Sequence, residues 1–197
     1  MAITELSVCG PGGDELCRLG MQGPGGGYVF FIDHEDLFPS FCATGDCNYL
    51  EFAPKDAASS ITWCSSAAAP SDGNSRELDA GWDKRAIGAG RTNTARMLDT
   101  SAEPHCTSGA AVEADEYAVP GGAGAGEWWL PSVAELMALF RVSNEFGVGD
   151  LTTSTWYWSS SERDMYNAWR FGSRSGQLDW DSKTSTSQVH VRAIRAF

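Results

Sequence analysis

The sequence predicts an α+β fold organised as a single loop-rich domain. Strand-like runs lie near both ends of the chain, at 28–32 and 188–197, and an amphipathic helical segment lies between them at 132–146. The composition, with 42% hydrophobic and 20% charged residues and 22 glycines, is that of a globular protein rich in turns. A chain of 197 residues can bury one good core, so we expect one domain with few long helices.

The first half of the chain carries the weaker signals of regular structure. Residues 1–22 show no clear period and predict an irregular arm that a cysteine ties down. Residues 28–32, YVFFI, predict a buried strand, and residues 48–52, NYLEF, a second strand that Pro54 ends. The glycines before residue 28 do not predict a phosphate loop, because they lead into a strand, whereas a phosphate cradle needs a helix N-terminus.

Loops and one short helix are expected in the middle of the chain. Residues 55–90 are loop-rich, with Trp63 and Trp82 as anchors beneath the loops. The segment RTNTARMLDT predicts a short helix whose N-cap is Thr92 or Asn93.

The clearest local signal is the segment WWLPSVAELMALFRVSNEF at 128–146. Ser132 and Glu135 form an S-x-x-E capping box, which predicts that a second helix begins there. The apolar positions repeat with the spacing of one helix face that packs against a core, and they are Val133, Leu136, Met137 and Phe140.

The C-terminal segment predicts strands that flank an unusual polar stretch. TWYWSSSE predicts a strand with Trp156 and Trp158 on one face, in the core, and NAWRF and QVHVRAIRAF predict further strands with turns between them. Between residues 162 and 189 the chain combines Tyr, Trp, Phe and Arg with small polar residues and almost no aliphatic ones. This composition is typical of an antibody paratope, although an ordinary polar hairpin with a few buried aromatic rings would share it.

Charge and cysteine content restrict the possible partners. Residues 1–127 carry 7 Lys and Arg against 19 Asp and Glu, within a net charge of −12, so we expect no nucleic acid as a partner. The six cysteines, Cys9, Cys17, Cys42, Cys47, Cys64 and Cys106, allow disulfides, with Cys42 and Cys47 as a local pair, and contain no CxxC motif for zinc. MAITELSV does not predict a secretory signal, and no apolar run predicts a membrane span.

Six motifs in order carry a resemblance to a known family. They are GPGGGYVFFID at 23–33, AIGAGRTNTARML at 86–98, EWWLPSVAELMALF at 127–140, YWSSSE at 157–162, NAW at 167–169 and VRAIRAF at 191–197. Together they resemble a bacterial and phage family with the C-type lectin fold. That family includes the Lcl C-terminal-like (DUF1566) domains, the formylglycine-generating-enzyme-like proteins and the variable proteins of diversity-generating retroelements.

The resemblance implies the organisation of the chain. It implies one C-type lectin-like domain at 23–197 after the arm at 1–22, with loop-rich antiparallel sheets and two helices. It also implies that the first and last strands pair and that a variable ligand-binding region lies at about 157–197. Cell-surface, secreted or virion-associated localisation fits such a protein, while oligomeric state and disulfide pairing stay open.

Among the branches, the retroelement-diversified proteins fit the C-terminal stretch best. Their templates mutate adenines, typically in AAC codons, which can yield most residue types in this stretch but neither Met165 nor Trp180. The resemblance therefore implies a surface that binds a protein or cell-surface ligand, with Tyr166, Phe171 and Trp180 as its main anchors. Its residues would be Arg163, Asp164, Tyr166, Asn167, Arg170, Phe171, Gly172, Ser173, Arg174, Leu178, Asp179, Trp180, Asp181, Ser182, Thr184 and Ser185.

The two alternatives to this function are catalysis and the binding of a sugar at a fixed site. Catalysis is not expected, because no nucleophile has a recognisable base partner, and no catalytic residue, metal or cofactor is predicted. Asp179 and Asp181 are too few for calcium, which usually takes about six or more oxygen ligands. The serious alternative is an Lcl-like adhesin that binds acidic polysaccharide at a fixed site through a basic cluster of Arg163, Arg170, Arg174 and Lys183.

Overall fold

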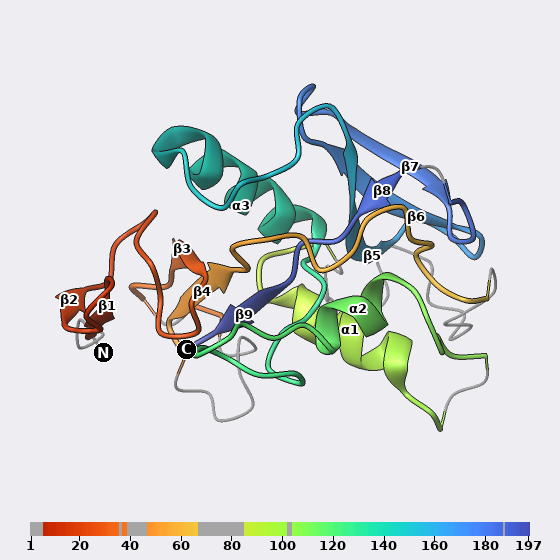
Figure 1. Ribbon diagram of the computed structural model, residues 1–197. Helices are drawn as coiled ribbons and strands as arrows, with labels where there is room; N and C mark the ends of the chain where they lie inside the picture. Colours follow the sequence, from red (N-terminus) through yellow and green to blue (C-terminus); the bar gives the residue numbers. More distant parts are fainter. Residues whose placement is uncertain (1–5, 36, 39–46, 67–84, 102–103, 187) are drawn as a thin grey trace.

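The expected α+β class is confirmed in the computed structural model, which describes residues 6–35, 37–38, 47–66, 85–101, 104–186 and 188–197. Within these ranges the chain forms three helices and mainly antiparallel sheets (Figure 1). The helices are α1 (Ala89–Leu98), α2 (Ala110–Asp115) and α3 (Val133–Phe146), so the expectation of two helices missed the short α2. None of the helices in the described ranges has the length and apolarity needed to cross a membrane.

The arm at the N-terminus is more regular than expected. Strands β1 (Ser7–Cys9) and β2 (Glu15–Leu16) form an antiparallel hairpin, and a disulfide joins Cys9 to Cys17. Both cysteines pack into a small core cluster that includes Val29. The prediction of an irregular arm was wrong here, because strands of three and two residues are too short to show a period in the sequence.

A three-stranded antiparallel sheet contains β3 (Tyr28–Ile32), β4 (Tyr49–Phe52) and β9 (Ile194–Ala196). The sheet confirms the first two predicted strands. The expected direct pairing of the first predicted strand with the last is wrong, because the fully buried β4 lies between them and pairs with both.

The glycine loop before β3 folds around a buried carboxylate. Glu51 on β4 accepts hydrogen bonds from the backbone N–H groups of Gly25 and Gly27, both at 2.9 Å, and its Oε1 lies 3.0 Å from the guanidinium of Arg195. A Cβ atom on Gly25 would stand 2.3 Å from the same carboxylate, so the loop needs glycine at that position. The loop therefore encloses an internal anion, which agrees with the rejection of a phosphate site.

A four-stranded sheet holds the C-terminal segment, in the order β7-β6-β5-β8. Its strands are β5 (Trp156–Glu162), β6 (Asn167–Gly172), β7 (Leu178–Ser182) and β8 (Val189–His190). Strand β7 was predicted as a turn, because it is polar and partly exposed and lacks an apolar period. The predicted terminal strand is divided between two sheets, since β8 pairs with β5 and β9 pairs with β4.

Helix α3 begins as predicted but turns a slightly different face to the core. The capping box is present: Ser132 Oγ accepts from the Glu135 N–H at 3.3 Å, and Glu135 accepts from the Ser132 N–H at 2.7 Å. Met137 is exposed, which corrects its assignment to the core. The buried apolar face contains Val133, Leu136, Leu139, Phe140 and Val142.

Helix α1 begins earlier than predicted. Gly88 is its N-cap residue and donates its N–H to Glu135 at 2.8 Å, so neither Thr92 nor Asn93 caps the helix. Asn93 instead lies inside the helix, where its amide donates to Ser160 Oγ at 3.0 Å. The same carboxylate that caps α3 thus also fixes the start of α1.

The loops beside α1 and α2 are anchored as expected. Trp63 is fully buried, and a disulfide between Cys64 and Cys106 closes a separation of 42 residues. Trp158 is fully buried in the same core cluster, and Trp156 packs against its edge. The predicted anchor Trp82 and the Cys42 member of the local cysteine pair lie outside the described residues.

Candidate ligand-binding surface

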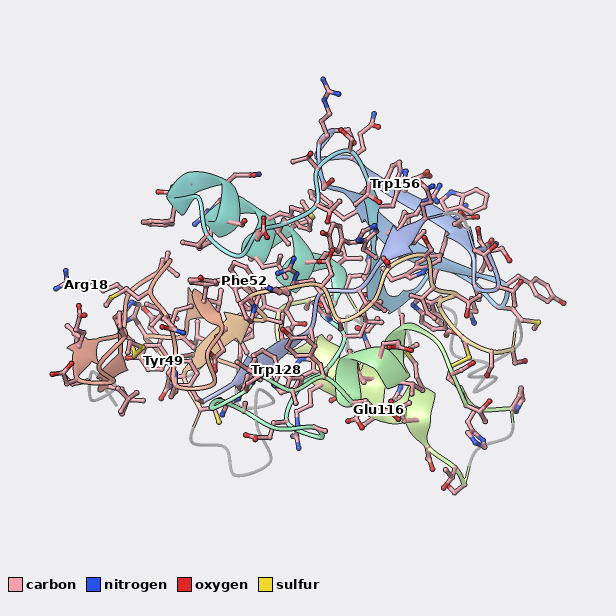
Figure 2. The ribbon with its side chains drawn as sticks, viewed as in Figure 1. Arg18, Tyr49, Phe52, Glu116, Trp128 and Trp156 are labelled. Carbon is pink, nitrogen blue, oxygen red and sulfur yellow. A yellow bond between two sulfur atoms is a disulfide. The ribbon has the colours of Figure 1, made fainter. Side chains whose placement is uncertain are left out.

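The predicted binding residues come together on β6, β7 and the turns that adjoin them. We call the side chains of residues 163–185 the hairpin surface. Strands β6 and β7 pair in a regular antiparallel register, from Asn167 opposite Ser182 to Phe171 opposite Leu178. In Figure 2 their side chains project around the labelled Trp156, at the opposite end of the molecule from the N-terminal hairpin.

The sixteen predicted residues differ in their access to solvent. Five are exposed: Tyr166, Arg174, Leu178, Trp180 and Thr184. Nine are half-buried: Arg163, Asp164, Asn167, Arg170, Ser173, Asp179, Asp181, Ser182 and Ser185. Two are buried, Phe171 and Gly172.

Phe171 belongs to the core and not to the binding surface. Its side chain is only 7% exposed, and its ring lies 5.1 Å from the ring of Phe140 on α3. The prediction that Phe171 anchors a ligand is therefore wrong, because α3 already covers the end of β6 that carries Phe171. Gly172 is likewise buried against the Trp156 ring and offers no side chain.

Exposed apolar groups are concentrated on this surface. Met165, Tyr166, Leu178 and Trp180 are four of the nine large hydrophobic side chains that are exposed among the described residues. Tyr166 is 59% exposed and Trp180 is 42% exposed. Single exposed hydrophobic residues are ordinary, but a concentration of them marks a site of interaction.

The turn between β5 and β6 is built by Asp164. Its Oδ1 accepts hydrogen bonds from the backbone N–H groups of Tyr166 and Asn167 and from the Asn167 side chain, at 2.8 to 2.9 Å. Partial burial raises the pKa of Asp164, but these hydrogen bonds and the charge of Arg163 lower it by more, so its net pKa lies below the usual value. Asp164 and Asn167 thus hold the turn that presents Tyr166.

One face of the β6–β7 pair is dominated by an ion-paired arginine. Arg170 Nη1 lies 2.6 Å from Asp181 and Nη2 lies 3.2 Å from Asp179, and the guanidinium also stacks 4.5 Å from the Trp156 ring. The Arg170 side chain is only 15% exposed. Two carboxylates and one indole therefore fix it in place.

The opposite face carries a second arginine on a pair of indoles. Side chains alternate along a strand, so Trp169 and Trp180, which are register partners, lie on the face away from Arg170. The Arg163 guanidinium lies 4.0 Å from the Trp180 ring centroid and 6.0 Å from the Trp169 centroid. Its ion pair is with the neighbouring Asp164, at 3.3 Å, and its side chain is 37% exposed.

A buried ion pair joins the hairpin surface to the core. Lys183, at the end of β7, is fully buried, pairs with Glu162 and lies 5.0 Å from the Trp63 ring. The expected basic cluster of the adhesin alternative is therefore not formed, because Lys183 is inside the protein and Arg170 is already paired. Of the four cations in that prediction, Arg174 alone is exposed and forms no ion pair within the described part of the chain.

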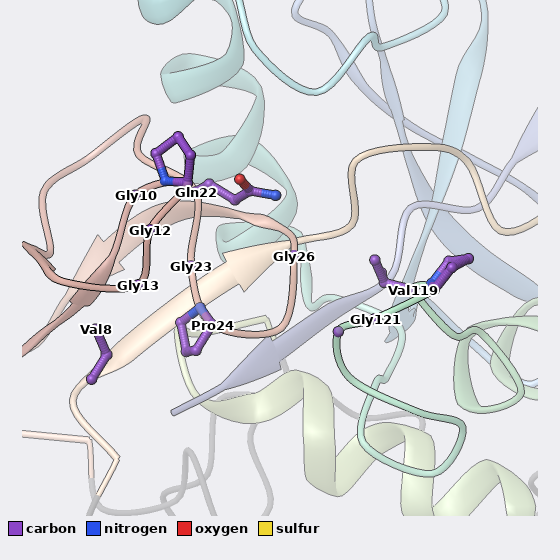
Figure 3. A pocket seen from close by; sticks show the side chains of 13 residues that line it. Val8, Gly10, Gly12, Gly13, Gln22, Gly23, Pro24, Gly26, Val119 and Gly121 are labelled. Atoms are coloured by element: carbon purple, nitrogen blue, oxygen red, sulfur yellow. The ribbon is translucent and has the colours of Figure 1, made fainter.

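Two hollows among the described residues could accept a ligand. One, of about 450 Å³, lies at the β6–β7 turn and is lined by Trp156, Arg174, Gln177 and small polar neighbours. The other, of about 330 Å³, lies between the N-terminal hairpin, the glycine loop and residues 119–122 (Figure 3). The second is lined mainly by glycine and proline and contains no charged side chain, so it offers little chemistry.

A polar cluster near β8 is centred on Asp56. Asp56 accepts from the Arg192 Nε at 2.9 Å and from the Tyr157 hydroxyl at 3.0 Å, and it pairs with His190 Nδ1 at 2.8 Å. No serine or cysteine in the described ranges hydrogen-bonds to His190. Within the described residues, no group of three or more His, Cys, Asp or Glu side chains is placed to hold a metal ion.

No protein-family model matches the chain, and a search of curated proteins finds no match.

Proposed function

We propose that the chain is a non-catalytic binding protein with a C-type lectin-like fold whose hairpin surface is diversified by a retroelement and meets a protein or cell-surface ligand. The observation that carries the proposal is the exposed apolar group of Met165, Tyr166, Leu178 and Trp180 on paired strands and a braced turn. Exposed aromatic residues on a rigid support give contact area with little loss of conformational entropy on binding.

The division of the hairpin between exposed and buried side chains supports the proposal of a surface that tolerates variation. The exposed positions Tyr166, Arg174, Leu178 and Trp180 contribute little to the core, whereas Phe171 and Lys183 are buried and hold the hairpin to the rest of the domain. Substitutions at the exposed positions should change which ligand the surface binds and leave the fold of the domain intact. The two disulfides among the described residues support a location in an oxidising compartment, such as the cell surface or a virion.

Sequencing the DNA around the gene tests the diversified origin. We expect a near-repeat of the bases that encode residues 163–185, with differences confined to adenines, beside a gene for a reverse transcriptase. A gene neighbourhood without such a repeat would contradict the diversification and leave a binding protein of fixed specificity.

Binding to arrays of proteins and glycans tests the class of ligand. We expect binding to protein probes that Tyr166→Ala weakens, with unfolding free energy changed by no more than about 1 kcal/mol, as for most surface substitutions. Strong glycan binding that a chelator abolishes would contradict a protein ligand. The hollow beside Trp156 and Arg174 would then be the first place to map that glycan.

A further inference from the structure

The two faces of the β6–β7 pair each stack an arginine on an indole, but they hold it with different strength. Arg170 is bound by two carboxylates and is 15% exposed, whereas Arg163 has one carboxylate partner and is 37% exposed. Arg163 is therefore the arginine that another cation can displace from its indole partners. Its position shows which chemical group the Trp169 and Trp180 indoles accept.

We infer that the indoles of Trp169 and Trp180, together with the carboxylate of Asp164, form a site for an arginine side chain of a partner protein, and that Arg163 occupies this site in the free protein. This inference rests on the proposed function, since it names the chemistry of a ligand for the hairpin surface. A guanidinium is flat, stacks well on indole rings and pairs with a carboxylate, so all three groups suit it.

The Asp164 carboxylate is oriented for this role. Its Oδ1 is held by the backbone of the turn, while Oδ2 lies 3.3 Å from the Arg163 guanidinium and 3.0 Å from the Asn167 amide. The hydrogen bonds of the turn hold this carboxylate in place when Arg163 swings into solvent. An incoming guanidinium would then take over the same ion pair.

The charge of the whole chain favours the same partner. The net charge of −12 attracts a basic partner over long range, and residues 128–197, with 7 basic and 7 acidic residues, do not oppose it locally. Long-range attraction would bring the basic partner to the protein, and one of its arginines would then replace Arg163 on the Trp169 and Trp180 indoles.

The test uses the whole protein and a peptide that alternates glycine and arginine, with its citrulline counterpart as the neutral probe. The variants are Arg163→Ala, which uncovers the indoles, and Arg141→Ala, which removes the same charge from an exposed position of α3 outside the hairpin surface. Binding is followed by the indole N–H signals of Trp169 and Trp180 in a tryptophan-labelled sample.

We expect Arg163→Ala to bind the arginine peptide about two- to five-fold more tightly than Arg141→Ala, because a cation–π contact at a partly exposed site has that strength. Adding Trp180→Leu to Arg163→Ala should remove the gain, and the citrulline peptide should not show it. Equal affinities of the two arginine variants, a gain that survives Trp180→Leu, or unchanged indole signals would each overturn the inference. None of these results depends on a DNA near-repeat, so the diversified origin is judged separately.

Discussion

Replacing Glu135 by glutamine should change how the stability of the protein depends on pH. The Glu135 side chain is fully buried and accepts N–H groups at the starts of α1 and α3. Burial raises the pKa of Glu135 to about 7, although the N–H donors from Ser132, Gly88 and Gly90 act in the opposite direction. In the unfolded chain the same carboxyl titrates near the ordinary value of 4.5.

The direction in which stability changes with pH follows from proton binding by Glu135. Between pH 4.5 and 7 the folded protein holds a proton on Glu135 that the unfolded chain has released, so stability is greatest below pH 4.5 and falls as pH rises through 7. The difference of 2.5 pH units corresponds to about 3 kcal/mol. Other groups titrate in this range, so the native protein must be compared with the Glu135→Gln variant.

Urea unfolding at a series of pH values, followed by tryptophan fluorescence, measures the effect. The free energy of unfolding of the native protein, relative to Glu135→Gln, should decrease by about 3 kcal/mol between pH 4.5 and 8. The glutamine shifts the absolute stability by disturbing the capping hydrogen bonds, but this offset does not depend on pH. Parallel pH profiles for the two proteins would refute the assignment of a raised pKa to Glu135.

Three further predictions concern the scaffold of the hairpin surface. Phe171→Ala should lower the unfolding free energy by about 3–5 kcal/mol in urea titrations, whereas Tyr166→Ala should lower it by less than about 1 kcal/mol. Equal losses would contradict the placement of Phe171 in the core and Tyr166 on the surface. Lys183→Met should lower the unfolding free energy by about 3–5 kcal/mol, because it removes the ammonium beside the buried Glu162 carboxylate. Combining it with Glu162→Leu should recover part of that loss. Additive losses in this double-mutant cycle would contradict an interaction between the two side chains. Replacing both Cys64 and Cys106 by alanine, which removes the disulfide that spans 42 residues, should destabilise the fold by about 4 kcal/mol, as judged by calorimetry of the variant and the native protein. An unchanged Tm would argue against that bond.

Local signals in the sequence predicted the elements that depend on local chemistry. The capping box of Ser132 and Glu135 located the start of α3, and the apolar run at 28–32 located β3, because capping and burial act within a few residues. The N-terminus of α1 was misplaced because its cap comes from Glu135, 47 residues away. Contacts over that distance leave no periodic pattern, and the position of β4 between β3 and β9 was missed for the same reason.

The candidate site was predicted as a segment but not residue by residue. The mixture of aromatic and small polar residues indicated the stretch around β6 and β7, yet composition could not separate the buried Phe171 from the exposed Tyr166. That separation depends on α3, which packs on one end of β6 and leaves the other end open. Likewise, nothing in the sequence showed that Lys183 would face inward, since its partner Glu162 lies on another strand.

The regular register of β6 and β7 restricts the length of the hairpin more strictly than its composition. Adding or deleting one residue within β7 would turn Trp180 toward Arg170, and would bring Asp179 or Asp181 onto the face of Trp169 and Arg163. Both arginine sites would be lost together, whereas a substitution at one position affects one face. Substitutions at the exposed positions of this segment are therefore compatible with the hairpin, whereas a change in the number of residues is not.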